Sequence, residues 1–383
     1  LLTQMAYDAL GRKVAMTDPD KGSITYQYNA LGELTQQTDA KGQVQRIYYD
    51  ALGRIYRKEQ TRQGASDDPA IGFEFDTAAR GSGLALGSLA VSSLSDGNYE
   101  QRADYDAYGR VLQLRTRIDG QTYYQRVVFD DYGRIWQKID ASTNPLSPYG
   151  TQTDYSAEGV PYQTRELDGQ VIQTLLEVNA RGQVVYERLH GNRNLTRTRS
   201  FDHNSGRLLM LAAGTDAGSE LQGLTFGYDA HGNLIRKQNR AGLGSNRFDL
   251  QEDYRYDSQD RLTQVFATRI NGVTRTEGSP TDPRDLTIEY DQLGNITAKA
   301  GITYGYKNAP GETGCSSTAG PHALSRYQNK FYCFDANGNN TQVRQSGQVI
   351  RSITYTGDDL AERIVRSEGT IQADSSFRYG PDR

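Results

Sequence analysis

Carboxylates, histidines, cysteines and closely spaced glycines are the residues of this chain whose types could do chemistry. Asp18 and Asp20, followed by Gly22, match the start of a calcium-binding loop, but the later ligand positions and the closing Glu are missing. Pro19 stands at the second position of a tight turn, so a plain turn explains the stretch. The other aspartates recur at regular intervals, whereas a catalytic pair would be unique. We therefore assign no metal site and no catalytic carboxylate.

The four histidines are scattered along the chain, at His190, His203, His231 and His322. His203 and His231 occupy variable turn positions, where a neutral surface histidine is the default. The chain has no His-Glu-x-x-His pair, no cysteine pair at metal-ligand spacing and no Gly-x-Ser-x-Gly elbow. The sequence predicts no enzyme activity and no cofactor.

Glycines at positions 81, 83 and 87 raise the possibility of a dinucleotide-binding loop. Such a loop requires a helix directly afterwards and an acidic residue about 20 positions on. Residues 89–94 instead read as a strand, and Asp96-Gly97-Asn98 reads as a hairpin turn. We interpret the stretch as strand and turn.

The two cysteines, Cys315 and Cys333, lie 18 residues apart. They could pair if their strands are adjacent, and two partly buried thiols are the simpler expectation. A pair of cysteines does not by itself make a disulfide framework.

Composition indicates a folded sheet with little core. Hydrophobic residues make up only 36% of the 383 residues, yet 26 Tyr and 10 Phe argue against disorder. Tyrosine can pack across strands and still tolerate water, so a sheet wetted on much of both faces fits these numbers. The net charge of −4, with both signs interleaved, argues against nucleic-acid binding. No apolar run approaches the roughly 18 residues of a membrane span.

A six-residue phrase organises the whole chain. Tyr7-Asp8-Ala9-Leu10-Gly11-Arg12 returns twice at an interval of 21 residues, and later copies drift but keep its pattern. A repeat this regular fixes the architecture. We assign as structural repeat turns the aromatic residue, the Asp or Asn and the Gly of each clear copy: Tyr7, Asp8, Gly11; Tyr28, Asn29, Gly32; Tyr49, Asp50, Gly53; Tyr105, Asp106, Gly109; Phe129, Asp130, Gly133; Tyr228, Asp229, Gly232; Tyr290, Asp291, Gly294; Phe334, Asp335, Gly338.

The phrase predicts a β-turn. Asp or Asn at the first turn position accepts hydrogen bonds from the backbone that follows, and Gly at the fourth position accepts a positive φ. Between copies lie second turns, of which Asp119-Gly120, Asp168-Gly169 and Asn271-Gly272 are strong hairpin signals. One repeat is therefore two antiparallel strands and two tight turns, and the predicted class is all-β.

These phrases resemble the bacterial RHS, or YD, repeat family, and they are similar to the YD shell of polymorphic toxins, toxin-complex cocoon subunits and teneurins. The resemblance covers nearly the whole chain, including a variant copy with one extra turn residue at 199–208. Residues 319–324 and 379–383 resemble phrases near the end of such arrays. The resemblance implies a strip of antiparallel hairpins that spirals into a hollow β-shell.

We expect one continuous array over residues 1–383, without internal domain boundaries. Irregular loops are expected near 62–72, 141–150, 238–248, 276–284 and 307–321. Because the chain starts inside a repeat, we expect it to be part of a longer polypeptide.

The resemblance also implies a function. The array would be a scaffold that encloses or carries a C-terminal toxin or effector, in a secreted or surface-delivered bacterial protein. Its partners would be the remaining repeats and the passenger of the same polypeptide, with glycans or a secretion-system component as further candidates. The alternative is a cell-surface adhesin or wall-associated module that recognises glycans or a partner cell; exposed aromatic patches outside the repeat positions would favour it.

The faces of the predicted strands support a wet interior. In residues 11–18, Val14 and Met16 share one face, while Lys13, Ala15 and Thr17 share the other. Neither face is wholly apolar, so no thick second layer is needed. We expect unpaired edge strands at both ends of the strip, where association can occur.

Overall fold

The structure is a computed structural model that describes residues 2–80, 83–147, 149–191, 194–215, 221–242, 247–276, 282–307, 315 and 319–381. All regular secondary structure in these residues is β, in 34 strands without a helix. The predicted all-β class is confirmed. Among the described residues, none forms a helix capable of crossing a membrane.

The strands follow one another closely along the chain. Their bounds are β1 Gln4–Tyr7, β2 Lys13–Asp18, β3 Gly22–Tyr28, β4 Leu34–Thr38, β5 Val44–Tyr49, β6 Ile55–Gln60, β7 Ile71–Phe75, β8 Ala79–Arg80, β9 Gly83–Leu84, β10 Leu89–Leu94, β11 Tyr99–Tyr105, β12 Val111–Ile118, β13 Gln121–Phe129, β14 Ile135–Ser142, β15 Gly150–Tyr155, β16 Pro161–Glu166, β17 Val171–Val178, β18 Val184–Leu189, β19 Leu195–Phe201, β20 Leu208–Gly214, β21 Gln222–Tyr228, β22 Leu234–Ala241, β23 Phe248–Tyr256, β24 Leu262–Ile270, β25 Val273–Thr274, β26 Leu286–Tyr290, β27 Ile296–Lys299, β28 Ile302–Tyr306, β29 Leu324–Tyr327, β30 Lys330–Phe334, β31 Asn340–Gln345, β32 Gln348–Tyr355, β33 Ala361–Glu368 and β34 Ile371–Ser376.

Nearly every strand pairs antiparallel with the strands before and after it, so the sheet is one long meander. The exceptions are local: β7 pairs with β10 because the hairpin β8–β9 is inserted between them, β8 makes one parallel pairing with β11, and β24 pairs with both β25 and β26. A meander places alternate turns on opposite edges. The predicted repeat turns therefore form one edge, here called the repeat rim, and the second turns form the other edge, the hairpin rim.

Each repeat turn carries a β-bulge. Tyr7 pairs with Lys13, Tyr28 with Leu34 and Tyr290 with Ile296, and the register shifts at every one of these pairs. The turn glycine supplies the left-handed residue that such a bulge requires, with φ of 86° at Gly32 and 76° at Gly53. Bulges bend a sheet and increase its twist. Because a bulge recurs at each repeat turn, the whole strip curves in one direction.

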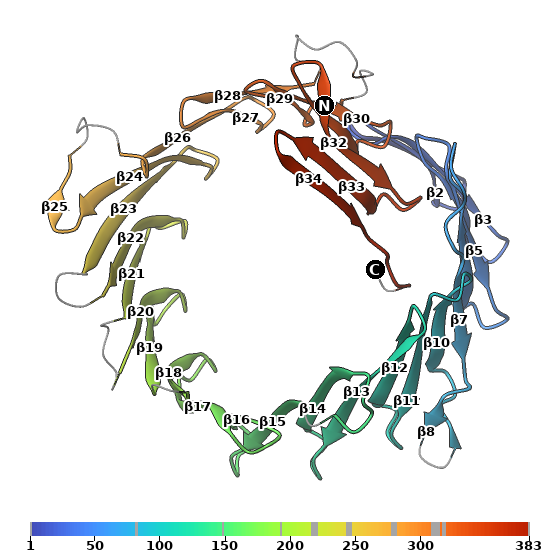
Figure 1. Ribbon diagram of the computed structural model, residues 1–383, viewed down its shortest axis with the longest axis horizontal. Coiled ribbons are helices and arrows are strands. Elements are labelled where there is room, and N and C mark those ends of the chain that lie inside the picture. Colours follow the sequence, from blue (N-terminus) through green and yellow to red (C-terminus); the bar gives the residue numbers. More distant parts are fainter. Residues whose placement is uncertain are drawn as a thin grey trace.

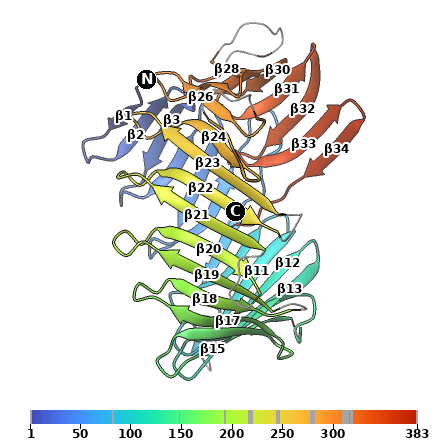
Figure 2. The same cartoon turned by 90° about the vertical axis from the view of Figure 1, so that its left-hand side faces the viewer.

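The curved strip closes into a ring after one turn. Figure 1 shows the strands running around an open centre, with β30–β34 returning beside the first strands. Figure 2 shows that these last strands are displaced along the ring axis, so the ring is one turn of a spiral. The N-terminal end lies at the edge of the ring, and the C-terminal end lies within its outline.

The wall of this ring is one sheet thick. Buried apolar residues are few and spread along the strip; one cluster of Ala78, Ala85, Ala90 and Val91 packs under Tyr105. The chain exposes 22730 Å² for a mass of 42.6 kDa. A compact monomer of this mass would expose about 15,000 Å². The excess is the surface of a wall that water reaches from both sides.

The structure adjusts several expectations about irregular segments. β14 runs to Ser142 and β22 to Ala241, so the first residues of the expected loops 141–150 and 238–248 are strand, and the loop expected at 62–72 ends before β7. Residues 277–281, 308–314 and 316–318, which the last two expected loops include, lie outside the described residues, as does most of the glycine run at 81–83. Cys315 and Cys333 form a disulfide, so the simpler expectation of two thiols was wrong. Sequence could not decide this, because the pairing requires Cys315 to lie beside Cys333 on β30.

The turn conformation leads to a prediction about Gly53. We expect Gly53→Val to lower the free energy of unfolding by about 2 kcal/mol, because a β-branched residue is strained at positive φ. Ala51→Val, two residues earlier in the same turn, should cost less than about 0.5 kcal/mol. Urea denaturation of both variants measures the difference. Equal midpoints would contradict the turn assignment.

Candidate functional site

The repeat turn is a hydrogen-bonded unit built around its first aspartate. In the first copy, Asp8 Oδ1 accepts hydrogen bonds from the main-chain N–H groups of Leu10 and Arg12, and Asp8 Oδ2 accepts one from Arg12 Nε at 2.7 Å. The same pattern recurs in the turns that begin at Asp50, Asp106 and Asp130. The hydrogen bonds from the Arg12 main chain and side chain outweigh burial and lower the pKa of Asp8. In these turns the carboxylates accept hydrogen bonds from their own turn.

The arginine of each turn reaches sideways to the aromatic residue of a following copy. The guanidinium of Arg12 stacks over the Tyr28 ring, 5.0 Å from its centroid, and that of Arg134 stacks 4.2 Å from the Tyr155 centroid. Cation–π contacts of this kind contribute about 0.5–1 kcal/mol at exposed sites. The sequence analysis assigned this arginine no role.

The tyrosine hydroxyl completes the contact between repeats. Tyr28 Oη donates a hydrogen bond to the carbonyl oxygen of Lys13 at 2.8 Å, and Tyr155 Oη donates one to that of Ile135 at 2.8 Å. Equivalent bonds are made by Tyr49, Tyr105, Tyr228, Tyr256, Tyr290, Tyr355 and Tyr379. Each accepting carbonyl lies at the bulge of the preceding turn. The signal was in the sequence, since the phrase favours Tyr over Phe.

We predict that Tyr155→Phe lowers the free energy of unfolding by about 1 kcal/mol, because it removes one such hydrogen bond and little else. Tyr149→Phe is the matched control, since the Tyr149 side chain is exposed and should tolerate the change. Thermal or urea denaturation gives both values. An equal, near-zero effect would mean that the hydroxyl bond does not hold repeats together.

Two copies of the turn were missed by the sequence analysis. Residues 256–261 place Asp260 at the glycine position with φ of 59°, and residues 355–360 place Asp359 there with φ of 61°. Aspartate tolerates this conformation better than most residues. An aromatic residue followed by Asp or Thr at the expected interval would have identified both copies.

The seam between the two ends of the strip joins opposite rims. Repeat-rim turns of β28–β33 and the residues after β34 lie on hairpin-rim turns of the first strands, with partners 259 to 314 residues apart. The polar contacts join His322 N to Asp20 Oδ1 (3.0 Å), Asn337 Nδ2 to Asp39 Oδ2 (2.7 Å), Lys41 Nζ to Asp335 Oδ2 (3.1 Å), Gln45 Nε2 to Asp358 Oδ1 (2.9 Å), Gly357 N to Asp68 Oδ2 (2.6 Å) and Arg378 Nη1 to Asp119 Oδ1 (2.6 Å). This seam could not be predicted from the sequence, because each contact depends on the curvature of the whole strip.

Arg62 is bonded to residues on both sides of the seam. Its Nη2 donates to the carbonyl oxygen of Tyr355 at 2.7 Å and to Glu362 Oε2 at 2.8 Å, and its Nη1 contacts Asp68 at 3.4 Å. The side chain is 13% exposed. The hydrogen bond and charge of Glu362 outweigh burial and raise the pKa of Arg62, so it is charged at any physiological pH.

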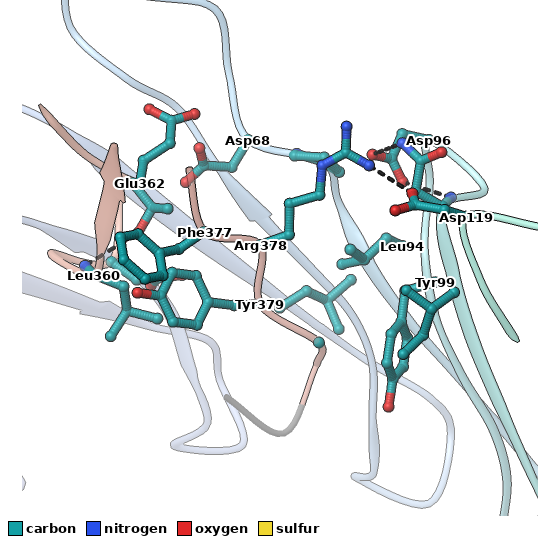
Figure 3. A pocket seen from close by; sticks show the side chains of 17 residues that line it. Asp68, Leu94, Asp96, Tyr99, Asp119, Leu360, Glu362, Phe377, Arg378 and Tyr379 are labelled. Carbon is teal, nitrogen blue, oxygen red and sulfur yellow. Dashed lines mark hydrogen bonds and ion pairs between the residues drawn. The ribbon is translucent and has the colours of Figure 1, made fainter. Parts of the chain in front are cut away.

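A cavity of about 340 Å³ lies at the end of the seam, between the residues after β34 and the first strands (Figure 3). Ile71, Leu94, Ile118 and Phe377 supply apolar walls, and several carboxylates surround them. The carboxylates of Asp68, Asp119 and Glu362 are engaged by Arg62 or Arg378. The charged side chains that line the cavity are therefore part of the contacts that hold the seam together.

The histidines lie apart and make local contacts. His231 Nδ1 lies 3.0 Å from Asp260 Oδ1, and the hydrogen bond to that carboxylate raises the pKa of His231. His190 contacts Thr174, and His322 contacts Asn295. In the described ranges no group of three or more histidine, cysteine or acidic side chains is arranged to hold a metal ion.

Comparisons with known proteins agree with this geometry. Residues 7–44 and 28–66 match the protein family described as RHS Repeat. No curated protein matches the chain. Among solved structures, the fold is similar to a crystal structure of TcdB2-TccC3 (TM-score 0.70, 18% identity, 99% of this chain and 22% of that chain) and to the Photorhabdus luminescens Tc holotoxin pore (TM-score 0.68, 17% identity, 99% of this chain and 21% of that chain). This chain thus spans about a fifth of the length of those chains.

The fold and the repeat turns define a class: a β-shell wall built from antiparallel hairpins in a spiral. Within that class, residues 7–66 match the RHS Repeat family and the fold is similar to that of the solved shell structures, so the resemblance seen in the sequence is confirmed.

Proposed function

We propose that this chain is a passive segment of a container that encloses or carries a C-terminal toxin or effector, in a secreted or surface-delivered bacterial protein. The shell and scaffold role itself follows from the fold. The path of the chain supports the enclosure of a C-terminal passenger. The strip curves into a ring, and the C-terminal end lies within the outline of that ring. A polypeptide attached there would start on the inside.

We also propose that this chain has no enzyme activity. The turn carboxylates are held by arginine, asparagine and main-chain N–H groups within their own turns, and the histidines lie far apart in the sequence. We expect no hydrolase, transferase or nuclease activity, and we expect alanine at His203 or His231 to change little. One of the similar structures is a Tc holotoxin pore, which is consistent with a secreted role.

Protection of a passenger tests the container. The same flexible segment with a protease site would be appended after residue 383 in one protein and before residue 1 in another, because the N-terminal end lies at the edge of the ring. We expect the C-terminal segment to be cleaved several-fold more slowly. Equal cleavage rates would contradict enclosure, and the adhesin alternative, which stays a prediction, would gain weight.

A further inference from the structure

Two aromatic side chains line a shallow depression on the sheet at β14–β16. Trp136 and Tyr162 are 38% and 40% exposed, and the depression that they line has a volume of about 330 Å³. Trp136 is the only tryptophan of the chain. Asp154 and Arg165 line the same depression. All four residues lie away from the seam, which joins the first strands to β28–β34 and the residues after them (Figure 1).

Trp136 and Tyr162 occupy the same place in consecutive repeats. The pairing register of each hairpin skips one residue at its bulge; in β13–β14 the skipped residue is Trp136, and in β15–β16 it is Tyr162. Only β15 separates β14 from β16, so the two positions lie about 10 Å apart across the sheet. The bulges therefore place two aromatic rings in a row, one on each repeat.

The skipped position does not require an aromatic residue. Threonine fills it at Thr35, Thr263 and Thr341, and each hydroxyl donates a hydrogen bond to a main-chain carbonyl of the neighbouring strand. Tyr56 also occupies this position, but its ring lies against that of Tyr48, with 6.3 Å between the centroids. Among the described hairpins, only β13–β14 and β15–β16 are consecutive and both aromatic here.

The polar ends of the two aromatic side chains are available to a ligand. The hydroxyl of the nearby repeat tyrosine, Tyr155, donates to a main-chain carbonyl. In the described part of the chain, by contrast, the Trp136 indole N–H and the Tyr162 hydroxyl have no hydrogen-bond partner. Both groups can therefore bond to a molecule that rests on the rings.

A fixed pair of charged groups lies beside the rings. Arg165 Nε donates a hydrogen bond to Asp154 Oδ2 at 2.8 Å, and the two side chains are 31% and 16% exposed. Arg165 Nη2 also donates to Gln163 Oε1 at 2.7 Å, and Asp154 Oδ1 accepts one from Gln152 Nε2 at 2.8 Å. The depression thus offers acceptors and donors with no net charge, held in place by the sheet.

This combination is suited to a sugar. A pyranose ring has a flat face of C–H groups that packs on an aromatic ring, and its hydroxyl groups both donate and accept hydrogen bonds. A proline-rich peptide also packs on aromatic side chains, but its free polar groups are carbonyl acceptors, which leave the Asp154 carboxylate without a donor. We propose that Trp136 and Tyr162, with Asp154 and Arg165, bind an extended, neutral oligosaccharide.

The spacing of the rings selects the kind of oligosaccharide. In cellulose and chitin, successive sugar rings are turned over, so the same face recurs at every second ring along a straight chain. Trp136 and Tyr162, two strands apart, suit the first and third rings of such a chain. Asp154 lies on the strand between them and would meet the hydroxyl groups of the middle ring. A helical chain such as amylose does not present its faces in this way.

Tryptophan fluorescence tests the site, because Trp136 is the only tryptophan. We expect cellotetraose or chitotetraose, titrated into the full chain, to change the emission in a saturable way, and maltotetraose to act at least several-fold more weakly. Tyr162→Ala keeps the reporter and should raise the Kd about tenfold, which corresponds to the loss of roughly 1.4 kcal/mol for one ring contact. Tyr149→Ala is the matched control and should leave the Kd unchanged, since Tyr149 is exposed but lies on the hairpin rim, outside the depression.

Three results would overturn the proposal. They are an emission that neither cellotetraose nor chitotetraose changes, a Kd that Tyr162→Ala does not raise, and a response to a polyproline peptide without one to the oligosaccharides. The last result would assign the depression to peptide binding. The site is independent of the container proposal, because protection of an appended segment from protease does not involve Trp136 or Tyr162.

Discussion

Glu187→Ala should lower the free energy of unfolding by about 3 kcal/mol, the largest effect we expect from a single side chain. Glu187 lies on β18, and its side chain is 2% exposed. Its Oε1 accepts hydrogen bonds from Arg197 at 2.7 Å and Arg199 at 2.6 Å, and its Oε2 accepts one from Gln173. The carboxylate thus ties together three adjacent strands, and its removal leaves two arginines without their shared partner.

The matched control is Asp374→Ala. Asp374 also pairs with an arginine across neighbouring strands, but its side chain and that of Arg363 are about half exposed. Water screens such a pair, so the change should cost less than about 1 kcal/mol. Urea denaturation of both variants decides the matter. Similar losses of unfolding free energy in the two variants would mean that the burial of Glu187 does not strengthen its ion pairs.

The pH dependence of this effect has a definite sign. Burial alone would raise the pKa of Glu187, but the hydrogen bonds from Arg199 and Gln173 and the charges of Arg199 and Arg197 hold it below the usual value of 4.5. The native state therefore favours the ionised form, and this stabilisation is complete above the unfolded pKa and is lost as pH falls through the folded pKa. The stability difference between wild type and Glu187→Gln should shrink on acidification below pH 4.5. A difference that stays constant down to the acid limit would contradict the pKa shift.

Arg62→Ala should open the ring at its seam. The guanidinium bonds to the Tyr355 carbonyl, to Glu362 and to Asp68, and the change removes all of these contacts. We expect a loss of about 2–3 kcal/mol that is local to the seam, since charged hydrogen bonds contribute about 1.5–3 kcal/mol each. The strand pairing in the rest of the sheet should stay intact.

Amide hydrogen exchange gives the direct readout. Protection of β32–β34 should fall in Arg62→Ala, while the protection of β17–β22 on the far side of the ring should not change. Arg134→Ala is the control with the same loss of charge, because Arg134 pairs with Asp130 inside its own repeat. Unchanged exchange in β32–β34, together with an unchanged radius of gyration in solution scattering, would show that the seam does not close the ring.

The local structure could be predicted from the sequence because each repeat turn is encoded within six residues. The Asp that accepts, the Gly that takes positive φ and the aromatic residue that ends the strand are neighbours in the chain, so the contacts of Asp8 with Leu10 and Arg12 can be inferred without a fold. The all-β class and the meander follow directly. The turn that contains Asp260 was not predicted, because aspartate there replaces the glycine that marks the other turns.

The remaining features depend on accumulated geometry. A bulge at Tyr28 bends the strip by an amount that no single repeat reveals, and only the sum over many repeats brings Asn337 to Asp39 and Gly357 to Asp68. The burial of Glu187 likewise requires three strands in register. The sequence alone thus determined the hairpins and their turns, because those interactions are short-range. The tertiary structure decided where the ring closes, which rim is covered and which cysteines meet, because these contacts join residues that only the curvature of the whole sheet brings together.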